Sequence, residues 1–346
     1  MADTRNTTQA PVAVHLEDPD AATAWWTTGP GKGQFRSEPL PTPSAAEAAV
    51  RTLWTGISRG TESLVARGAV PESERERMRA PFQAGDFPFP VKYGYLNVGV
   101  VENGPSALRG RTVFALVPHQ SRYVAPADAL AVVPDDVPAR RAVLAGAVET
   151  AVNVLWDAAP VVGDRVLVVG AGIVGGAIAR LARGIPGAEV TLVDVDPGKA
   201  ATAHALGVAF AEAEDLGDAD LVADVVIEAS GTGAGLQRAL RAAPTDGEVV
   251  VASWYGSDAV PLELGADFHS RRIAIRSSQV GAVSVRRRAQ RSTRDRLALA
   301  LRLLADPAFD ALLGGATPWR ALPEITAALA AGSAGVLCQT IDWSAE

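Results

Sequence analysis

A glycine-rich turn between two strand-like segments is the feature that most limits how this chain can fold. An apolar run at residues 166–169 leads directly into Gly170-Ala171-Gly172-Ile173-Val174-Gly175. A small-residue helical pattern follows, and a second apolar run at 190–193 ends at Asp194. Strand, tight turn, helix and strand at this spacing form a βαβ unit, so the sequence predicts an α/β domain around a doubly wound parallel sheet.

The three glycines have separate physical roles in such a turn. Gly170 permits the tight turn, Gly172 lets the backbone approach a pyrophosphate, and Gly175 lets the helix pack closely on the strand. The first helical residues, Ile173 and Val174, bring free N–H groups and the positive end of the helix dipole to the anion. The sequence therefore predicts a dinucleotide-binding site at this turn.

Asp194 predicts which dinucleotide is bound. It lies nineteen residues after Gly175 (194 − 175 = 19), where it can accept hydrogen bonds from both ribose hydroxyls. Its charge would repel the 2′-phosphate of NADP, and Asp196 adds to that repulsion. We therefore expect NAD as the cofactor, although a βαβ unit that no longer binds nucleotide has the same pattern.

The composition limits the class of protein. A chain of 346 residues with 48% hydrophobic residues suggests about two domains, and its net charge of −7 argues against a nucleic-acid partner. The longest apolar runs have strand length, so we expect no membrane span. The single cysteine, Cys338, and a polar N-terminus without a secretory pattern suggest a cytoplasmic protein. The arginines between Arg286 and Arg296 are typical of a solvated face, or else contact an acidic substrate or a subunit.

The pattern along the chain suggests two domains. Short β-like runs, one of them at 56–60, surround an irregular, charged and proline-rich stretch at 64–90. Strands and helices alternate from 166 to 277, and the C-terminal strand-like segment at 336–341 is expected to pack back on the N-terminal half. We predict a β-rich domain formed by residues 1–148 together with 283–346, and a nucleotide-binding domain formed by residues 149–282.

This order of domains and three local motifs resemble the medium-chain dehydrogenase/reductase superfamily. Gly56-Ile57-Ser58-Arg59-Gly60-Thr61-Glu62 is similar to a family segment that usually reads Gly-Ile-Cys followed by Arg-Ser-Asp or Gly-Thr-Asp. Segments 224–231 and 247–251 resemble the fourth and fifth strands of its nucleotide domain. The resemblance extends from about residue 12 to 343. It implies a GroES-like catalytic domain, a Rossmann domain that binds NAD, and a homodimer.

The zinc ligands of the family are missing at the matching positions. The first cysteine is replaced by Ser58, the Gly-His-Glu step reads Gly94-Tyr95-Leu96, and the third ligand falls near Ala145 or Gly146. None of these side chains binds zinc, and one cysteine cannot form the four-cysteine structural lobe. We therefore expect no metal. The chain most resembles the zinc-free branch that includes bacteriochlorophyllide a dehydrogenase, whose members oxidise a secondary alcohol with NAD.

Without a metal, a proton donor or fixed hydrogen bonds must stabilise the developing alkoxide. Tyr95 stands where relatives have the zinc-binding histidine and is a candidate acid whose pKa nearby Lys92 would lower, or else it fills the vacated space. Ser58 is a hydrogen-bond donor or inert. Glu62 is a polar residue behind the catalytic groups or a structural acid, and His119 is a proton shuttle on a loop facing the cleft or a hydrogen-bonded structural histidine.

The nicotinamide and the substrate are expected to meet between the domains. Trp254 and Tyr255 follow a sheet strand and are expected to bind substrate together with Lys92, or to pack between the domains. The resemblance also implies cofactor contacts from Arg59, Thr150, Ser230, Ser277 and Gln279.

These observations lead to one interpretation and two alternatives. We interpret the chain as a zinc-independent, NAD(H)-dependent oxidoreductase that interconverts a secondary alcohol and a ketone on a small-molecule intermediate of specialised metabolism. The alternatives are an NADPH-dependent quinone or enone reductase, against which Asp194 argues, and a non-catalytic nucleotide-binding protein on the same fold.

Overall fold

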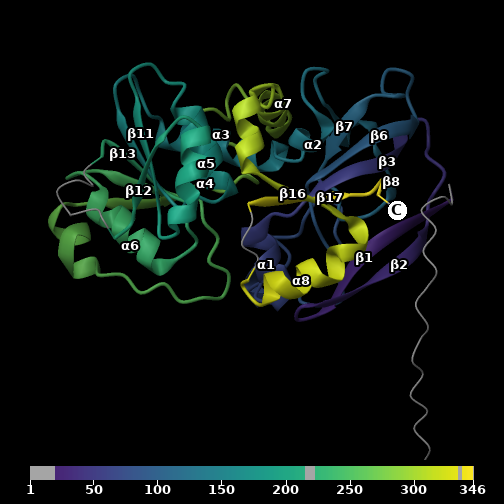
Figure 1. Ribbon diagram of the computed structural model, residues 1–346, viewed down its shortest axis with the longest axis horizontal. Helices are drawn as coiled ribbons and strands as arrows, with labels where there is room; N and C mark the ends of the chain where they lie inside the picture. Colours follow the sequence, from purple (N-terminus) through teal and green to yellow (C-terminus); the bar gives the residue numbers. More distant parts are fainter. Residues whose placement is uncertain (1–19, 215–222, 334–336, 346) are drawn as a thin grey trace, which may run out of the picture.

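The computed structural model describes residues 20–214, 223–333 and 337–345, which form two lobes lying side by side (Figure 1). The parallel lobe contains a six-stranded parallel sheet, and the antiparallel lobe contains a seven-stranded, mainly antiparallel sheet and a four-stranded one. No helix in these described ranges combines the length and the apolar character needed to cross a membrane.

The parallel lobe has the strand order β12-β11-β10-β13-β14-β15. The order reverses between β10 and β13, and open α/β sheets bind ligands at such a reversal, beyond the carboxyl ends of the strands. The strands are β10 (Arg165–Val169), β11 (Glu189–Asp194), β12 (Ala209–Glu212), β13 (Val225–Glu228), β14 (Glu248–Val251) and β15 (Ala274–Ser277). The helices that accompany them are α3 (Ala145–Ala158), α4 (Ile173–Ala182), α5 (Ala200–Ala205), α6 (Gly233–Ala242) and α7 (Thr293–Leu303).

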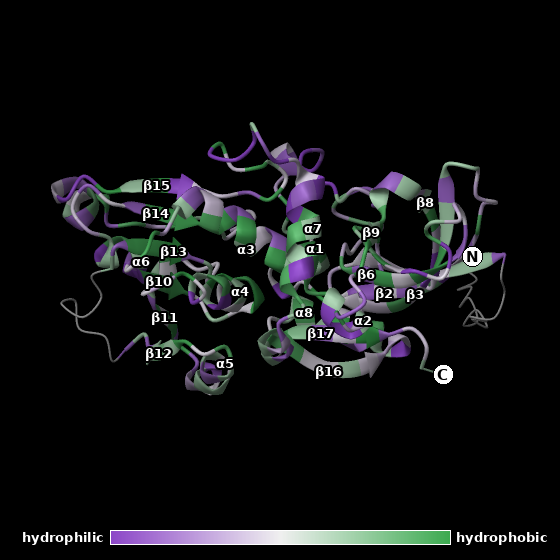
Figure 2. Cartoon of the chain, turned by 90° about the horizontal axis from the view of Figure 1, so that it is seen from above, coloured by the Kyte–Doolittle hydropathy of each residue, from purple (hydrophilic) through white to green (hydrophobic). Residues whose placement is uncertain are grey.

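Both faces of the parallel sheet are covered, which explains why its central strands are apolar throughout. Val166 and Val168 of β10 are buried in one cluster with residues of α3, α4 and α7, whereas Leu167 and Val169 are buried with residues of α6. Figure 2 shows the hydrophobic residues concentrated in β13, β14 and the adjoining helices. The sequence prediction of a doubly wound sheet is confirmed.

The antiparallel lobe is assembled from both ends of the chain. Its strands are β1 (Ala21–Gly29), β2 (Lys32–Pro39), β3 (Glu47–Gly56), β4 (Ala84–Gly85), β5 (Val91–Lys92), β6 (Asn97–Asn103), β7 (Thr112–Ala115), β8 (Arg122–Pro126), β9 (Ala131–Val132), β16 (Leu313–Pro318) and β17 (Cys338–Asp342). Its helices are α1 (Arg59–Arg67), α2 (Ala139–Ala142) and α8 (Leu322–Ala330). Strand β17 pairs antiparallel with β3 through Thr340 and Gly56, and the two strands lie side by side in Figure 1. The C-terminal segment therefore completes the sheet of the N-terminal half.

The sequence patterns were wrong where the local signal is short. The run at 56–60 was expected to be a strand, but β3 ends at Gly56 and α1 begins at Arg59. The Glu62 carboxylate accepts the Ser58 N–H at 2.7 Å and so stabilises a helix start that hydrophobic periodicity does not reveal. The stretch from residue 64 is also not irregular throughout, since α1 continues to Arg67. The hairpin of β1 and β2 was not predicted.

The loop after β14 connects the two lobes. Gly256 has a φ of 63°, and a Cβ atom there would lie 2.7 Å from Leu64 Cδ2 and 2.9 Å from the Ala69 carbonyl oxygen. Trp254 packs against a buried cluster of the antiparallel lobe that includes Val65 and Tyr93. This loop therefore holds the carboxyl ends of the parallel strands against α1.

The contact at Gly256 gives a stability prediction. Gly110 has a similar φ of 73° but nothing within 4 Å of an added Cβ, so Gly110→Ala is a matched control. We expect the control to lose about 1 kcal/mol of unfolding free energy from left-handed strain alone. Gly256→Ala should lose roughly 1–3 kcal/mol more, because it also overpacks the junction. Urea unfolding of both variants measures the difference, and equal losses would contradict a tight junction.

Candidate active site

The glycine-rich turn lies at the carboxyl end of β10, beside the point where the strand order reverses. Gly170 has a φ of 106°, and a Cβ atom there would lie 2.5 Å from the Ser230 nitrogen. A Cβ atom at Gly175 would lie 1.8 Å from the Gly170 carbonyl oxygen, so both positions require glycine. Gly172 caps α4, and a Cβ atom there would meet nothing within 4 Å, which leaves that backbone open to a ligand.

Asp194 ends β11 next to this turn. Its Oδ2 accepts the Ala171 N–H at 2.7 Å, and its Oδ1 accepts the Asp196 N–H at 3.0 Å. Each carboxylate oxygen can accept a further hydrogen bond, so the side chain is able to hold the turn and receive ribose hydroxyls together. The first turn of α4, with Ile173 and Val174, completes an arrangement that fits a dinucleotide.

Glu228 is a functional candidate that the sequence analysis missed. It ends β13, is 0% exposed, and accepts hydrogen bonds at Oε1 from the Ser230 N–H and hydroxyl, both at 2.6 Å. Its Oε2 accepts the Tyr255 hydroxyl at 2.8 Å. The carboxylate thus joins the turn after β13 to the loop after β14. An acid at the end of an otherwise apolar strand was the signal that could have revealed it.

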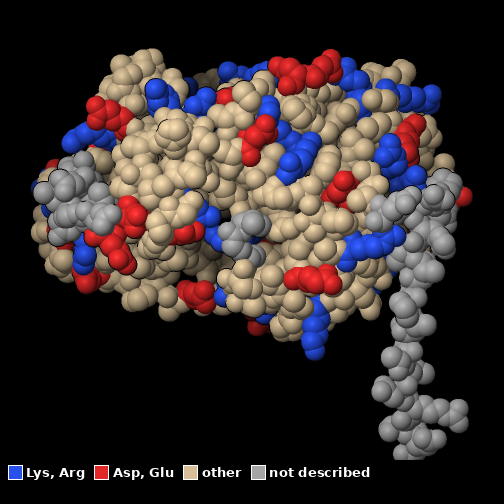
Figure 3. All heavy atoms as spheres, in the orientation of Figure 1, with Lys and Arg blue, Asp and Glu red and all other residues tan. Residues whose placement is uncertain are grey.

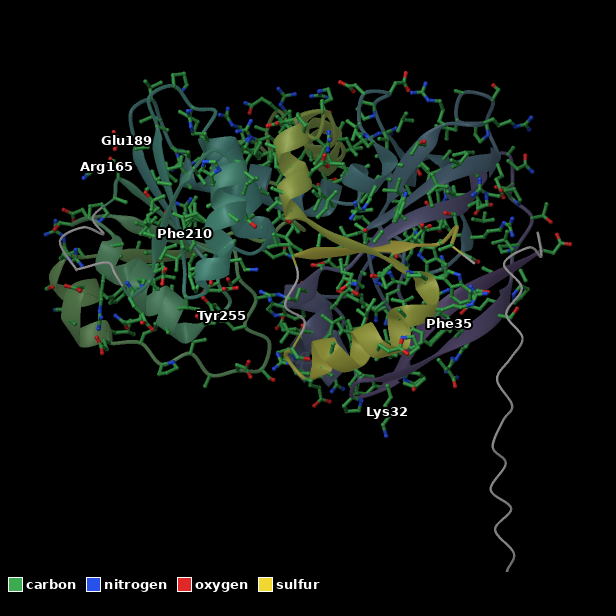
Figure 4. All side chains as sticks on the ribbon, viewed as in Figure 1. Lys32, Phe35, Arg165, Glu189, Phe210 and Tyr255 are labelled. Atoms are coloured by element: carbon green, nitrogen blue, oxygen red, sulfur yellow. The ribbon has the colours of Figure 1, made fainter. Side chains whose placement is uncertain are left out.

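The Tyr255 hydroxyl therefore already has a hydrogen-bond acceptor within the protein, the Glu228 carboxylate. Burial raises the pKa of its hydroxyl, and the charge of Glu228 raises it further, so the phenol remains a donor to that carboxylate. Tyr255 follows β14 in the chain, and Figure 4 shows it on the side of the parallel lobe that faces the antiparallel lobe. A contact of Tyr255 with substrate stays a prediction, as it does for Trp254, which packs at the junction of the lobes.

Other predicted cofactor contacts lie on elements around the junction. Ser277 is exposed at the end of β15, and the amide of Gln279 accepts the Gly281 N–H at 2.7 Å. Thr150 on α3 donates its hydroxyl to the Gly146 carbonyl at 2.9 Å, and Arg59 is exposed in the first turn of α1. Their contacts with a cofactor stay predictions.

Tyr95 and Ser58, which the resemblance matches to two metal-ligand positions, form a hydrogen-bonded pair. The Tyr95 hydroxyl donates to Ser58 Oγ at 2.5 Å. Burial raises the pKa of Tyr95 to about 12, although hydrogen bonds with Ser58 and Thr61 oppose the rise. The prediction that Lys92 lowers this pKa is wrong. The Lys92 ammonium instead forms an ion pair with the Glu38 carboxylate, with Nζ and Oε2 2.6 Å apart. This is the distance of a charge-assisted hydrogen bond.

Leu96 fills the space beside this pair. A Cβ atom at Gly146 would lie 2.5 Å from Leu96 Cδ2, and one at Gly56 would lie 3.3 Å from Leu96 Cδ1. Among the residues that the structure describes, no group of three or more His, Cys, Asp or Glu side chains is arranged to hold a metal ion. A hydroxyl, a buried phenol and an aliphatic side chain also do not match the ligands that zinc prefers.

A buried carboxylate–imidazole pair lies behind Ser58. Glu62 Oε2 and His119 Nε2 are 2.9 Å apart, and His119 is 2% exposed. His119 Nδ1 lies 2.8 Å from the Thr55 hydroxyl, which also accepts the Trp343 indole N–H at 3.0 Å. Accepting the Trp343 N–H leaves the Thr55 hydroxyl its own proton to donate to Nδ1, an assignment in which Nε2–H donates to Glu62. His119 lies in the loop between β7 and β8, as expected, and is enclosed there. A proton-shuttle role stays a prediction.

Arg296 corrects the interpretation of the arginine cluster. Five of these arginines are exposed, as expected of a solvated face, namely Arg286, Arg287, Arg288, Arg291 and Arg294. Arg296 is 1% exposed and pairs with Glu149 at 3.1 Å. It lies on the side of α7 that packs against α3, which the sequence analysis did not recognise.

The raised pKa of Tyr95 gives a pH prediction. Since its pKa is about 12, the neutral phenol persists through neutral and mildly alkaline pH and is lost only near pH 12. Rapid pH-jump absorbance at 295 nm, recorded before unfolding, should show a tyrosinate component near pH 12 that Tyr95→Phe removes. If Tyr95→Phe instead removed a tyrosinate component with a midpoint near pH 10, the Tyr95 hydroxyl would not be buried.

Comparisons with known proteins place this geometry in a structural class. No protein-family model and no curated protein matches the sequence, whereas solved structures match nearly its full length. L-idonate 5-dehydrogenase from Escherichia coli K-12 has a TM-score of 0.75 at 15% identity and covers 93% of this chain and 98% of its own. The chain has the fold of the medium-chain dehydrogenases. The predicted fold class, a GroES-like domain with a Rossmann domain, is confirmed.

Two further neighbours were solved with different nicotinamide cofactors. A zinc-binding dehydrogenase from Sinorhizobium meliloti 1021, bound to NADP, has a TM-score of 0.73 at 18% identity, with 93% of this chain and 99% of that chain covered. An alcohol dehydrogenase from Escherichia coli CFT073, in complex with NADH, has a TM-score of 0.73 at 17% identity and the same coverage. The fold thus accommodates either cofactor, and the choice depends on individual side chains.

Proposed function

We propose that this protein is a zinc-independent, NAD(H)-dependent oxidoreductase of the medium-chain superfamily that interconverts a secondary alcohol and a ketone. The observation that carries the proposal is the Tyr95–Ser58 pair at 2.5 Å. The sequence resemblance matches these two positions to metal ligands of zinc enzymes in the superfamily. This pair supplies a hydroxyl donor in a lobe that packs directly against the carboxyl ends of the parallel strands.

The cofactor assignment is supported by Asp194 and the turn that it holds. The turn from Gly170 to Gly175 and the start of α4 would bind the pyrophosphate, and Asp194 would accept the ribose hydroxyls. Arg59, Thr150, Ser230, Ser277 and Gln279 would complete the binding site. The cofactor supplies the hydride donor or acceptor, whereas the protein orients the reacting carbon and manages the proton.

Tyr95 would manage that proton. During ketone reduction a substrate oxygen replaces Ser58 as acceptor of the Tyr95 hydroxyl, and the phenol transfers its proton as negative charge develops on that oxygen. A pKa of about 12 suits this role, because an alkoxide is a stronger base than a phenolate. The negative charge then lies on the Tyr95 oxygen, to which Ser58 would donate its own hydroxyl proton. Glu62 keeps Ser58 in place through the backbone N–H.

The proposal also covers what the protein binds: a small-molecule substrate and a second copy of itself, and no nucleic acid. The substrate would be a small molecule of specialised metabolism, in line with the resemblance to the branch that includes bacteriochlorophyllide a dehydrogenase. Figure 3 shows charges of both signs interspersed over one face, which does not favour nucleic acid there. A homodimer would form through β15, the terminal strand of the parallel sheet, where Ile275 is 40% exposed.

Asp194 can be tested through cofactor selectivity. Titration of tryptophan fluorescence with NADH and NADPH should show NADH at least about tenfold tighter, a difference of about 1.4 kcal/mol. Asp194→Ser should bring the affinity for NADPH closer to that for NADH, because the 2′-phosphate of NADPH no longer meets a carboxylate. Glu189→Gln, at the opposite end of β11, is the matched control and should change neither affinity. A preference for NADPH would instead favour quinone or enone reduction, and no binding of either would remove the enzyme assignment.

Tyr95 can be tested through turnover. Once a secondary alcohol or ketone substrate is identified by screening, Tyr95→Phe should lower kcat by about 10²- to 10⁴-fold, the usual contribution of a general acid. The affinity for NADH should not change. Tyr93→Phe is the control, because its ring packs edge-on against Tyr95 with centroids 5.9 Å apart but leaves the Ser58 bond intact. Equal turnover in wild type and Tyr95→Phe would exclude Tyr95 as the acid.

A further inference from the structure

One buried guanidinium joins three elements beside the proposed cofactor site. Arg296 lies on α7 and directs its Nε to Glu149 Oε1 at 3.1 Å and its Nη1 to Asn153 Oδ1 at 2.5 Å. Glu149 and Asn153 are four residues apart on α3, so they present their side chains on one face of that helix. The ion pair therefore fixes α7 to α3.

The same guanidinium also holds the loop that follows β15. Arg296 donates from Nη1 to the Ala282 carbonyl at 3.2 Å and from Nη2 to the Val280 carbonyl. Its planar fork thus reaches a helix and a loop at once, which a lysine ammonium on a flexible stem does not reproduce.

Asn153 makes the attachment of this loop continuous. Its Oδ1 accepts the Ser284 N–H at 3.0 Å, and its Nδ2 donates to Ser278 Oγ at 3.3 Å. The Ser278 hydroxyl in turn donates to Asp157 Oδ2 at 2.6 Å. The loop is consequently bound to α3 and α7 at every second residue from 278 to 284.

Burying the Arg296–Glu149 ion pair costs desolvation free energy. We infer that the fixed position of the loop at 278–284 is what this cost secures. Arg296 is 1% exposed, and burial raises the pKa of Glu149 even though the charge of Arg296 opposes the rise. A buried ion pair contributes little net stability compared with apolar side chains of the same volume. What it provides is a defined geometry for the groups that it joins.

The network adjoins two of the expected cofactor contacts, Thr150 and Gln279, on the β13–β15 half of the parallel sheet. Thr150 is the neighbour of Glu149 on α3, and Gln279 lies between Ser278 and Val280, both of which the network holds. Gly170 to Gly175 and Asp194, which would bind the pyrophosphate and ribose, lie in the turn between β10 and α4, in the first turn of α4 and at the end of β11. None of the hydrogen bonds described for Arg296, Asn153 and Ser278 involves them. The network is therefore confined to one end of the proposed cofactor site.

We propose that Arg296 is a positioning residue for the nicotinamide end of the cofactor, acting through the loop at 278–284 and through α3. The assignment rests on the proposed function, since it requires a nicotinamide dinucleotide at the carboxyl ends of the parallel strands. It gives Arg296 a role distinct from that of the exposed arginines that precede it.

Comparison of NADH with ADP-ribose, which lacks the nicotinamide, isolates this role. Calorimetric titration of Arg296→Met and Arg296→Lys should show NADH binding weakened at least tenfold and ADP-ribose binding changed less than twofold. The lysine variant should not recover NADH binding, because it cannot reach both loop carbonyls and Asn153. Arg294→Met, an exposed arginine on the same helix, is the control and should bind both ligands as wild type does.

Other outcomes overturn the assignment. Parallel weakening of NADH and ADP-ribose would mean that Arg296 only supports the fold, and unchanged binding of both would mean that the loop needs no such support. If the Arg296 variants do not fold, Asn153→Ala tests the same loop from α3 and should give the same selective loss of NADH. Failure of the wild-type protein to bind either ligand would refute the proposed function itself, and the assignment with it.

Discussion

The buried carboxylate of Glu62 is the group on which the antiparallel side of the site depends. One carboxylate oxygen of Glu62 accepts the Ser58 N–H at the start of α1, and the other is hydrogen-bonded to Nε2 of the His119 ring. These bonds fix where β3 turns into α1 and hence where the Ser58 hydroxyl meets Tyr95. A buried acid left without either partner would cost several kcal/mol, so the helix start, the imidazole and the Tyr95–Ser58 pair support one another.

A second buried carboxylate, that of Glu228, fixes two loops of the parallel lobe through its hydrogen bonds. Glu228 joins the turn at Ser230 to the loop that carries Tyr255, and the next residue of that loop, Gly256, contacts α1. The end of the parallel sheet and the Tyr95 pair are therefore connected through one short loop. The proposed hydride transfer would require the reacting groups to be held close and aligned, and this connection would provide that alignment across the junction.

The sequence predicted what depends on neighbouring residues and missed what depends on distant ones. The glycine turn and Asp194 lie within one βαβ unit, so their spacing alone predicted the parallel sheet and the contact between the turn and Asp194. The partner of Arg296, Glu149, is 147 residues away, and the partner of Lys92, Glu38, is 54 residues away. Hydrophobic periodicity carries no information about such pairs, which is why a solvated Arg296 and a Lys92 acting on Tyr95 were both expected.

We propose that a phenol and a hydroxyl take the part in this protein that zinc takes in the zinc enzymes of the superfamily it resembles. The most direct test is to measure zinc and turnover together, on protein produced with added zinc and again after dialysis against a chelator. The account predicts far less than one zinc per chain and the same turnover before and after dialysis. One zinc per chain, removed by the chelator together with the activity and restored with it, would contradict the account.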